Sequence, residues 1–375
     1  MIEHIYWGDT HQNTYTYGSQ VPSMDDTLSF ARTYLDFYSG AYYTPTSYPV
    51  PLLPQTTLPE IPSPDGHISE KPPVPTEVWQ GIRAEKLKDL AVIKREWGEF
   101  QLATSAHNTP HQFITFPGFE WQGDGSWGDH NIIYKAEGYP VLTDMDLPTI
   151  YSQLKGKPAL AIPHHTAYHP GIRAPKWQYL DENISPFTEI YSIHGCSETD
   201  ESWVGMRQNS HMGPAMGSGT YQNALDQGLH LGAICSTDNW SQMPGRWGHG
   251  LMGCIAKELT REGLWEAFQS RRVYGVTGDR IHLNFSVNDN PMGSVLPYAD
   301  HRKIIVNVKC LDALDRIEIL RNGRVIATHN HQEVTQEPTS GKTTRFITRI
   351  EAGWGSRMGE IPFITHDWNG ELHLS

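Results

Sequence analysis

The spacing of apolar and polar positions changes near residue 280. Before that point, short apolar runs alternate with stretches in which apolar residues recur every three or four positions. The first arrangement predicts buried strands and the second predicts amphipathic helices. Beyond residue 280, strictly alternating runs are separated by turn sequences such as Asn-Gly, which are typical of antiparallel hairpins. We therefore expect an α/β domain over residues 1–280 and a small antiparallel β-sandwich domain over residues 281–375.

Several elements of the first part can be placed by their residue types. Residues 24–38 predict a helix that runs into a strand, with Asp25 or Asp26 as its N-cap. The clearest helix is expected over residues 77–102, where charged residues separate the apolar positions. Residues 44–75 are dense in proline, which leaves two alternatives, a long ordered excursion or lid and a disordered loop. The alternation of strands and helices favours a mostly parallel sheet or barrel.

Polar side chains follow five of the predicted strands at the point where each strand ends. In the first, YWGDTHQNT, the polar residues alternate and therefore point to one side of an extended backbone. Residues that follow the strands of a barrel converge on one face, so these side chains are expected to form one cluster. The strand ends carry Asp9, His11 and Asn13, then Glu120, then His164 and His165, then His194, and finally Asp238.

This combination of residue types predicts a metal site. Glu120 lies in the apolar and aromatic run FPGFEW, and a buried carboxylate requires a partner such as a cation. Histidine and carboxylate ligands suit Zn²⁺, Mn²⁺ or Fe²⁺ equally well. A carboxylate shared by two ions, with histidines on both sides, is typical of a two-metal hydrolytic site. We expect one or two divalent ions.

Composition and charge narrow the classes of partner. The chain has 375 residues, which suggests two domains, and a net charge of −13, which argues against a broad nucleic-acid surface. The four cysteines form no CxxC pair and do not indicate a disulfide framework. No apolar run is long enough for a membrane span, and no signal peptide is evident. The unpaired cysteines and the absent signal peptide favour a cytoplasmic protein, with a removed leader as the alternative, and the oligomeric state is left open. The expected partner is a small-molecule ester substrate rather than a nucleic acid or a membrane.

The motifs together resemble the PHP superfamily of metal-dependent phosphoesterases. The resemblance is closer to the domain-of-unknown-function family 3604, in its carbaryl-hydrolase-like branch. The matching stretches include YWGDTHQNT, FITFPGFEWQG, ALAIPHHT, EIYSIHG and ICSTDN. The resemblance implies a distorted (β/α)₇ barrel with metals at the carboxyl ends of its strands. It also implies a site in which Glu120 bridges the metals, and the remaining ligands are Asp9, His11, His164, His194 and Asp238.

Three positions depart from the pattern of that family. Asn13 stands where a second histidine is expected, and Trp240 replaces the last histidine. The Thr-Asp-His sequence expected after the second strand is replaced by Ala41-Tyr42-Tyr43. The resemblance therefore implies one or two metals rather than three. His249 could replace a lost ligand.

The leading hypothesis is a metal-dependent hydrolase, in which a metal-activated water attacks a phosphoester or a carboxylic or carbamate ester. His11 and Asp238 would hold one ion, while His164 and His194 would hold the other. His165 or His249 would protonate the leaving group. The alternative is a binding protein with a degenerate metal site, and a glycan-related role is a weaker rival.

Six further residues are predicted to contact the substrate. Arginines near the motifs are candidate anion clamps, and aromatic residues suggest a pocket for an apolar or aromatic group. The predicted contacts are Asn13, Tyr43, His130, Arg173, Trp240 and Arg246.

Overall fold

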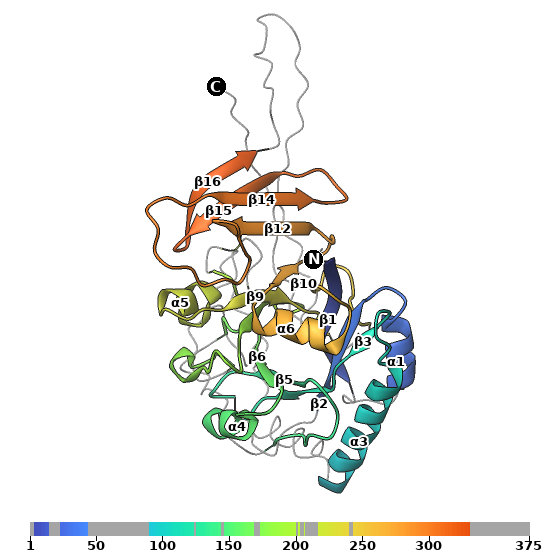
Figure 1. Ribbon diagram of the computed structural model, residues 1–375. Helices are drawn as coiled ribbons and strands as arrows, with labels where there is room; N and C mark the ends of the chain where they lie inside the picture. The colour runs from blue at the N-terminus through green and yellow to red at the C-terminus, as the bar shows by residue number, and fades with distance from the viewer. Residues whose placement is uncertain are drawn as a thin grey trace, which may run out of the picture.

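The computed structural model describes residues 4–14, 23–43, 90–123, 125–143, 146–168, 173–199, 202, 206, 217–239 and 243–330. These residues form a mixed α/β fold around one curled eight-stranded sheet (Figure 1). The strand order is β11-β10-β1-β2-β4-β5-β6, with β3 paired to β2. The strands are β1 (His4–Thr14), β2 (Phe37–Tyr43), β3 (Ile114–Thr115), β4 (Gly118–Trp121), β5 (His130–Tyr134), β6 (Ala159–Pro163), β10 (Leu251–Ala256) and β11 (Val273–Val276).

A second sheet lies between the two edges of the curled one. It has the order β8-β7-β9, with β7 at Phe187–Ser192, β8 at Gly195–Cys196 and β9 at Gly232–Cys235. Strand β6 lies beside β7, and β11 lies beside β9. The two sheets together therefore surround a common interior.

The strand directions in the curled sheet are mixed. Strands β1, β2 and β4 are parallel neighbours, whereas β4–β5, β5–β6, β1–β10 and β10–β11 are antiparallel pairs. The prediction of a mostly parallel sheet is therefore wrong. Only residues 122–129 join β4 to β5, and a parallel pair would need a much longer crossover connection. The distorted (β/α)₇ barrel remains a prediction.

The helices occur close to where the periodicity predicts them. The first helix, α1, starts at Met24, and its N-cap is Ser23, whose hydroxyl accepts a hydrogen bond from the backbone N–H of Asp26. The predicted caps Asp25 and Asp26 are therefore wrong; both lie in the first turn, where negative charge complements the helix dipole. The helices are α1 (Met24–Ala31), α3 (Leu90–His107), α4 (Leu147–Leu154), α5 (Tyr221–Asp226) and α6 (Arg261–Gln269), with 3₁₀ turns η2 (Trp177–Tyr179) and η3 (Gly217–Gly219).

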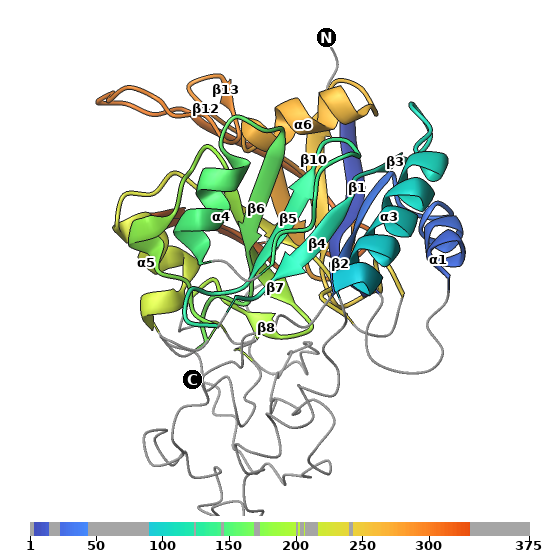
Figure 2. The ribbon, with the colours of Figure 1, turned by 90° about the horizontal axis from the view of Figure 1, so that it is seen from below.

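Two apolar clusters lie on opposite faces of the curled sheet. Neighbouring side chains of β2 point to opposite faces of the sheet, so Phe37 belongs to one cluster and Tyr38 to the other. The cluster of Phe37 draws side chains from both sheets and from Trp265 and Phe268 of α6. Helix α6 lies at one end of the strands, and β8 lies at the other (Figure 2). The end opposite α6, where β1 terminates, is the end that carries the predicted polar residues.

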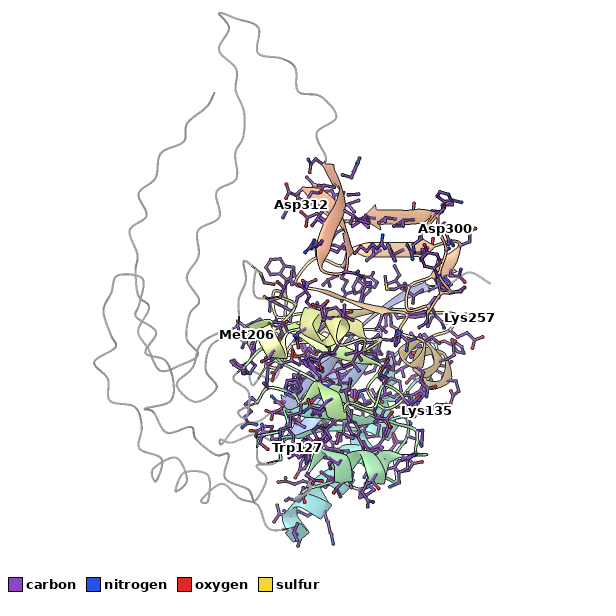
Figure 3. The ribbon with its side chains drawn as sticks, turned by 90° about the vertical axis from the view of Figure 1, so that its left-hand side faces the viewer. Trp127, Lys135, Met206, Lys257, Asp300 and Asp312 are labelled. Atoms are coloured by element: carbon purple, nitrogen blue, oxygen red, sulfur yellow. The ribbon has the colours of Figure 1, made fainter. Side chains whose placement is uncertain are left out.

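The C-terminal strands are antiparallel, as the alternating pattern predicts. They form a three-stranded sheet, β13-β12-β14, and a two-stranded sheet, β15-β16. Asp300 and Asp312 mark this part in Figure 3, apart from Trp127 and Lys135 on the larger part. The domain boundary and the β-sandwich remain predictions, since residues 331–375 lie outside the described residues. The strands are β12 (His282–Val287), β13 (Asn290–Pro291), β14 (Ile304–Lys309), β15 (Arg316–Arg321) and β16 (Arg324–Asn330).

Some predictions concern residues that the structure does not describe. The proline-rich stretch 44–75, Trp240 and residues 77–89 of the long predicted helix lie outside the described ranges. Within those ranges, none of the helices combines the length and the apolar character that crossing a membrane requires.

Candidate metal centre

Eight buried side chains with metal-ligating atoms converge at the end of the sheets opposite α6. They comprise four carboxylates and four histidines, and each is at most 5% exposed. They form four overlapping groups of three, and within each group the ligand atoms lie within 4.8 Å of one another. We call these residues the eight-residue cluster. The groups are His11, Glu120 and His164; Asp129, His164 and His165; His165, His194 and Asp238; and His11, Glu189 and Asp238.

The strand directions explain why these residues meet. Strands β1, β4 and β6 point the same way within the curled sheet, so their carboxyl ends lie at one edge. Asp238 and His194 follow the parallel strands β9 and β7 of the second sheet. Asp129 comes from the opposite direction, because it immediately precedes the antiparallel strand β5. One edge therefore collects residues from six strands.

His11 lies at the centre of the cluster. Its Nδ1 is 3.0 Å from Oε2 of Glu189, and its Nε2 is 3.3 Å from Oδ1 of Asp238 and 3.8 Å from Oε2 of Glu120. The pairing of β1 with β2 shifts register between Asp9 and Gln12, and such an irregularity changes the direction of a side chain. Burial opposes protonation of His11, but the charges of Asp238 and Glu189 raise its pKa well above the usual value. A bound cation would compensate the negative charges of Asp238 and Glu189 in place of a proton on His11.

Glu120 stands between two histidines. Its Oε1 is 3.5 Å from Nε2 of His164 and accepts a hydrogen bond from Nε2 of Gln122 at 2.8 Å. Its Oε2 faces His11. Burial alone would raise the pKa of Glu120, but His11 and His164 lower it below the usual range. These contacts favour the ionised form of Glu120, and its Oε2, which has no hydrogen-bond partner, is available to a cation.

Asp238 and His194 form the third part of the cluster. Nε2 of His194 is 3.2 Å from Oδ2 of Asp238, and its Nδ1 is hydrogen-bonded to the Tyr168 hydroxyl at 2.8 Å. Asn13 donates from its side-chain amide to Oδ1 of Asp238 at 3.1 Å. Asp238 adopts a φ of 44°, a strained backbone conformation of the kind found at functional sites.

Many polar atoms of this region are buried without a hydrogen-bond partner. Buried polar groups are nearly always paired, so a concentration of exceptions requires a further binding partner. Their number and chemical types fit divalent ions with histidine and carboxylate ligands. These atoms are His11 Nε2, Glu120 Oε2, Asp129 Oδ1, His164 Nδ1 and Nε2, His165 Nδ1, Glu189 Oε1 and Asp238 Oδ2.

Asp9, a predicted ligand, is not in any of the four groups. Its Oδ1 accepts from the backbone N–H groups of His11 and Thr237, both at 3.1 Å. Its Oδ2 accepts from the Thr237 hydroxyl at 2.6 Å and from the backbone N–H of Gly245 at 2.8 Å. With four donors on its carboxylate, Asp9 joins β1 to the segment after β9.

Three predicted substrate contacts are buried beside the cluster. The Tyr43 hydroxyl accepts a hydrogen bond from Nε2 of Gln122 at 2.9 Å, which connects it to Glu120. His130 is fully buried, and burial together with the charge of His164 lowers its pKa to about 3. Arg173 is buried against Asp129.

Two other predicted residues lie outside the four groups. Arg246 is exposed, and His249 is half-buried with its backbone N–H bonded to the carbonyl of Arg246 at 3.1 Å. The roles assigned to them from sequence stay predictions.

Two members of the cluster are absent from the sequence predictions, Asp129 and Glu189. Glu189 lies in the middle of β7, in the apolar run PFTEIYSIHG. The argument that singles out Glu120, a carboxylate within an apolar strand, applies to Glu189 equally. Asp129 directly precedes His130, which was itself singled out.

Comparison with known proteins gives a family match over the part of the chain that contains β7, β9 and the polar residues that follow them. Residues 182–303 match the family described as "Protein of unknown function (DUF3604)". This stretch contains Glu189, His194 and Asp238. The carbaryl-hydrolase-like branch stays a prediction.

Similar chains occur in chlamydiae. An uncharacterized protein of Chlamydia pneumoniae is 26% identical over 256 residues, which cover 62% of this chain and 40% of that protein. An uncharacterized protein of Chlamydia trachomatis is 28% identical over 207 residues, covering 48% of this chain and 31% of that protein. The chain thus spans less than half the length of these relatives.

Among solved structures, the chain is similar to a two-domain protein from Bacteroides vulgatus. That protein is described as containing a predicted PHP-like metal-dependent phosphoesterase. The similarity has a TM-score of 0.44 at 12% identity, and it covers 88% of this chain and 95% of the other.

Proposed function

We propose that this chain is a metal-dependent hydrolase whose eight-residue cluster holds two divalent ions. The observation that carries the proposal is the charge imbalance of a buried site. Four carboxylates lie within the cluster, whereas Arg173 is the one buried lysine or arginine among the described residues. Buried charges require compensation, and divalent cations provide it with the ligands present.

The grouping of donors suggests how the ions would be held. His11, Glu120 and His164 would hold one ion, while His165, His194 and Asp238 would hold the other. The sequence-based pairing of His11 with Asp238 on one ion belongs instead to the alternative group of His11, Glu189 and Asp238, in which Nε2 of His11 is 3.3 Å from Oδ1 of Asp238. The pairing of His164 with His194 is not favoured, since His164 lies against Glu120 and His194 lies against Asp238. Glu189, bonded to Nδ1 of His11, would fix the orientation of that imidazole.

In such a site, divalent ions lower the pKa of a bound water and polarise the bond that is cleaved. The protein supplies a buried, carboxylate-rich environment and a set of closely spaced imidazole rings. Burial and the charges of His164, His194 and Arg173 lower the pKa of His165 well below the usual value. His165 belongs to the group that would hold the second ion, so of the two predicted proton donors we favour His249.

The proposal is tested by elemental analysis of the purified chain, followed by assays with aryl phosphates, aryl carboxylates and aryl carbamates. We expect bound Zn, Mn or Fe and hydrolysis of at least one class of ester. A protein that binds no metal even when Mn²⁺ or Zn²⁺ is supplied, and that cleaves no ester, would contradict the proposal. That result would favour the binding protein with a degenerate metal site.

A further inference from the structure

Arg173 differs from the other predicted anion-binding residues because it is buried at the cluster. It is 6% exposed, and its Nη1 donates to Oδ2 of Asp129 at 2.5 Å. The same carboxylate oxygen is 3.5 Å from Nε2 of His165. The charge of Arg173 is also close enough to interact with Glu120 and Tyr43. The guanidinium therefore borders the cluster rather than the solvent.

The segment that carries Arg173 is locked to the segment that carries Asp129. The backbone N–H of Arg173 donates to the carbonyl of Gly125 at 2.7 Å. A Cβ added to Gly128 would lie 2.8 Å from the backbone N of Pro175, so a larger residue would push the two segments apart. In addition, Nζ of Lys176 lies 3.8 Å from the ring centroid of Trp127. These contacts hold the guanidinium in place before any ligand arrives.

Arg173 retains unused binding capacity in this position. Its Nε is buried and has no hydrogen-bond partner. Its φ of 68° is a strained conformation for a non-glycine residue, and such strain persists where the surroundings enforce it. A guanidinium offers a planar set of donors that matches the oxygens of a phosphate.

The contact with Asp129 also bears on where ions can bind. Asp129, His164 and His165 form one of the four metal-capable groups, but the guanidinium already neutralises the carboxylate of this group. The other groups stay available to ions, and the guanidinium lies next to one of them, because the Asp129 oxygen that it contacts is also 3.5 Å from Nε2 of His165.

We infer that Arg173, fixed by Asp129, binds an anionic oxygen of the substrate and makes the site selective for phosphoesters over neutral carboxylic or carbamate esters. The inference rests on the proposed hydrolase function. Asp129 is then a positioning residue, and Arg173 is a specificity-determining one.

The test uses the full, metal-loaded chain, with inorganic phosphate as the probe in calorimetry. Arg173→Lys keeps the charge but removes the planar fork, so we expect phosphate affinity to fall at least tenfold with unchanged metal content. With aryl phosphate, kcat/KM should fall by a similar factor, whereas kcat/KM for a neutral aryl carboxylate should change less than twofold. Arg95→Met, which alters an exposed arginine of α3, is the control and should change none of these quantities.

A second variant keeps the test valid if Arg173→Lys leaves Asp129 unpaired and the protein does not fold. The double variant R173M/D129N removes both charges together, and it should show the same selective loss of phosphate binding. Unchanged phosphate affinity in both variants would overturn the inference. So would a loss of phosphate affinity accompanied by a loss of metal, because the effect would then act through the ions. If the parent chain binds phosphate through Arg173 but holds no metal and cleaves no ester, the proposed function fails while the anion site stands.

Discussion

Two buried carboxylates, Asp9 and Glu120, differ in how their oxygens are satisfied. Asp9 accepts four hydrogen bonds from protein groups. Glu120 accepts one, from Gln122, and its Oε2 has no hydrogen-bond partner. A carboxylate saturated by donors serves the structure, whereas an unsaturated one is available to a ligand. The two residues should therefore respond differently to the same Asp→Asn or Glu→Gln change.

Glu120→Gln should lower metal content by at least one ion per chain and reduce hydrolysis at least a hundredfold. The amide preserves shape but loses the charge that attracts a cation, and it has only one acceptor oxygen. Elemental analysis and ester assays check this, with circular dichroism to show that the variant is folded. Glu99→Gln, on the exposed face of α3, is the matched control. Full metal occupancy in Glu120→Gln would show that this carboxylate is not a ligand.

Asp9→Asn should lower the free energy of unfolding by about 2–3 kcal/mol, since two of the four donors lose their acceptor and the other two keep only a neutral one. Once folded, the variant should still bind metal. Denaturant unfolding and elemental analysis measure the two effects, and Asp226→Asn, at the exposed C-terminal end of α5, is the control. The opposite result, normal stability with lost metal, would support the ligand role that the sequence suggests.

At the level of elements, α6 is fixed to the curled sheet through its first residue. Arg261 donates from Nη1 and Nη2 to the carboxylate of Glu137 at 2.9 and 2.6 Å, and from Nε to the carbonyl of Thr115 at 2.8 Å. Leu264, Trp265 and Phe268 of the same helix pack into the interior. The polar and apolar contacts together close the end of the sheets opposite the metal site.

Arg261→Lys should lower stability by about 1 kcal/mol at pH 7, because a lysine cannot form the paired hydrogen bonds. Burial would raise the pKa of Glu137, but Arg261 lowers it below the usual 4.5. The contribution of this pair is therefore complete above pH 4.5 and is lost as the pH falls through the lower folded-state pKa. The stability difference between parent and variant, measured by urea unfolding from pH 7 to pH 3, should shrink accordingly.

The control for this experiment is Arg316→Lys. Arg316 also contacts two carboxylates, those of Asp315 and Glu318, but on an exposed strand. It should show no measurable change at any pH, since exposed ion pairs contribute little. A difference for Arg261→Lys that stays constant down to pH 3 would show that Glu137 is not its energetic partner.

Periodicity predicted most elements because burial on one face determines where apolar residues recur. It did not give strand direction, which depends on how the chain returns to the sheet. This had a direct consequence for the site. The residues predicted from sequence lie at the carboxyl ends of strands, whereas β5 runs the other way and presents its amino end to the cluster. Asp129 was missed for that reason. Glu189 was missed because it lies in the middle of β7, whereas Glu120 is next to the last residue of β4.

At the scale of the whole molecule, the cluster places four carboxylates in the interior of a chain that already carries a net charge of −13. Removing bound ions with a chelator should therefore destabilise the fold. At a free ion concentration a hundredfold above the dissociation constant, each site contributes about 2.7 kcal/mol. Thermal unfolding before and after chelation, and after reloading with Zn²⁺ or Mn²⁺, measures the effect. An unchanged melting temperature after complete removal of metal would contradict it.

The wide separation of the cluster residues along the chain has a kinetic consequence. Asn13 and Asp238, which are hydrogen-bonded, lie 225 positions apart, and the other residues of the eight-residue cluster come from separate strands. The long loops between these segments must close before the donors meet, so the site should be incomplete in the transition state for folding. Bound metal should then slow unfolding and leave the refolding rate unchanged. Stopped-flow measurements with and without Zn²⁺ distinguish the cases: faster refolding in the presence of metal would mean that the strands meet around the ion early, rather than enclosing it last.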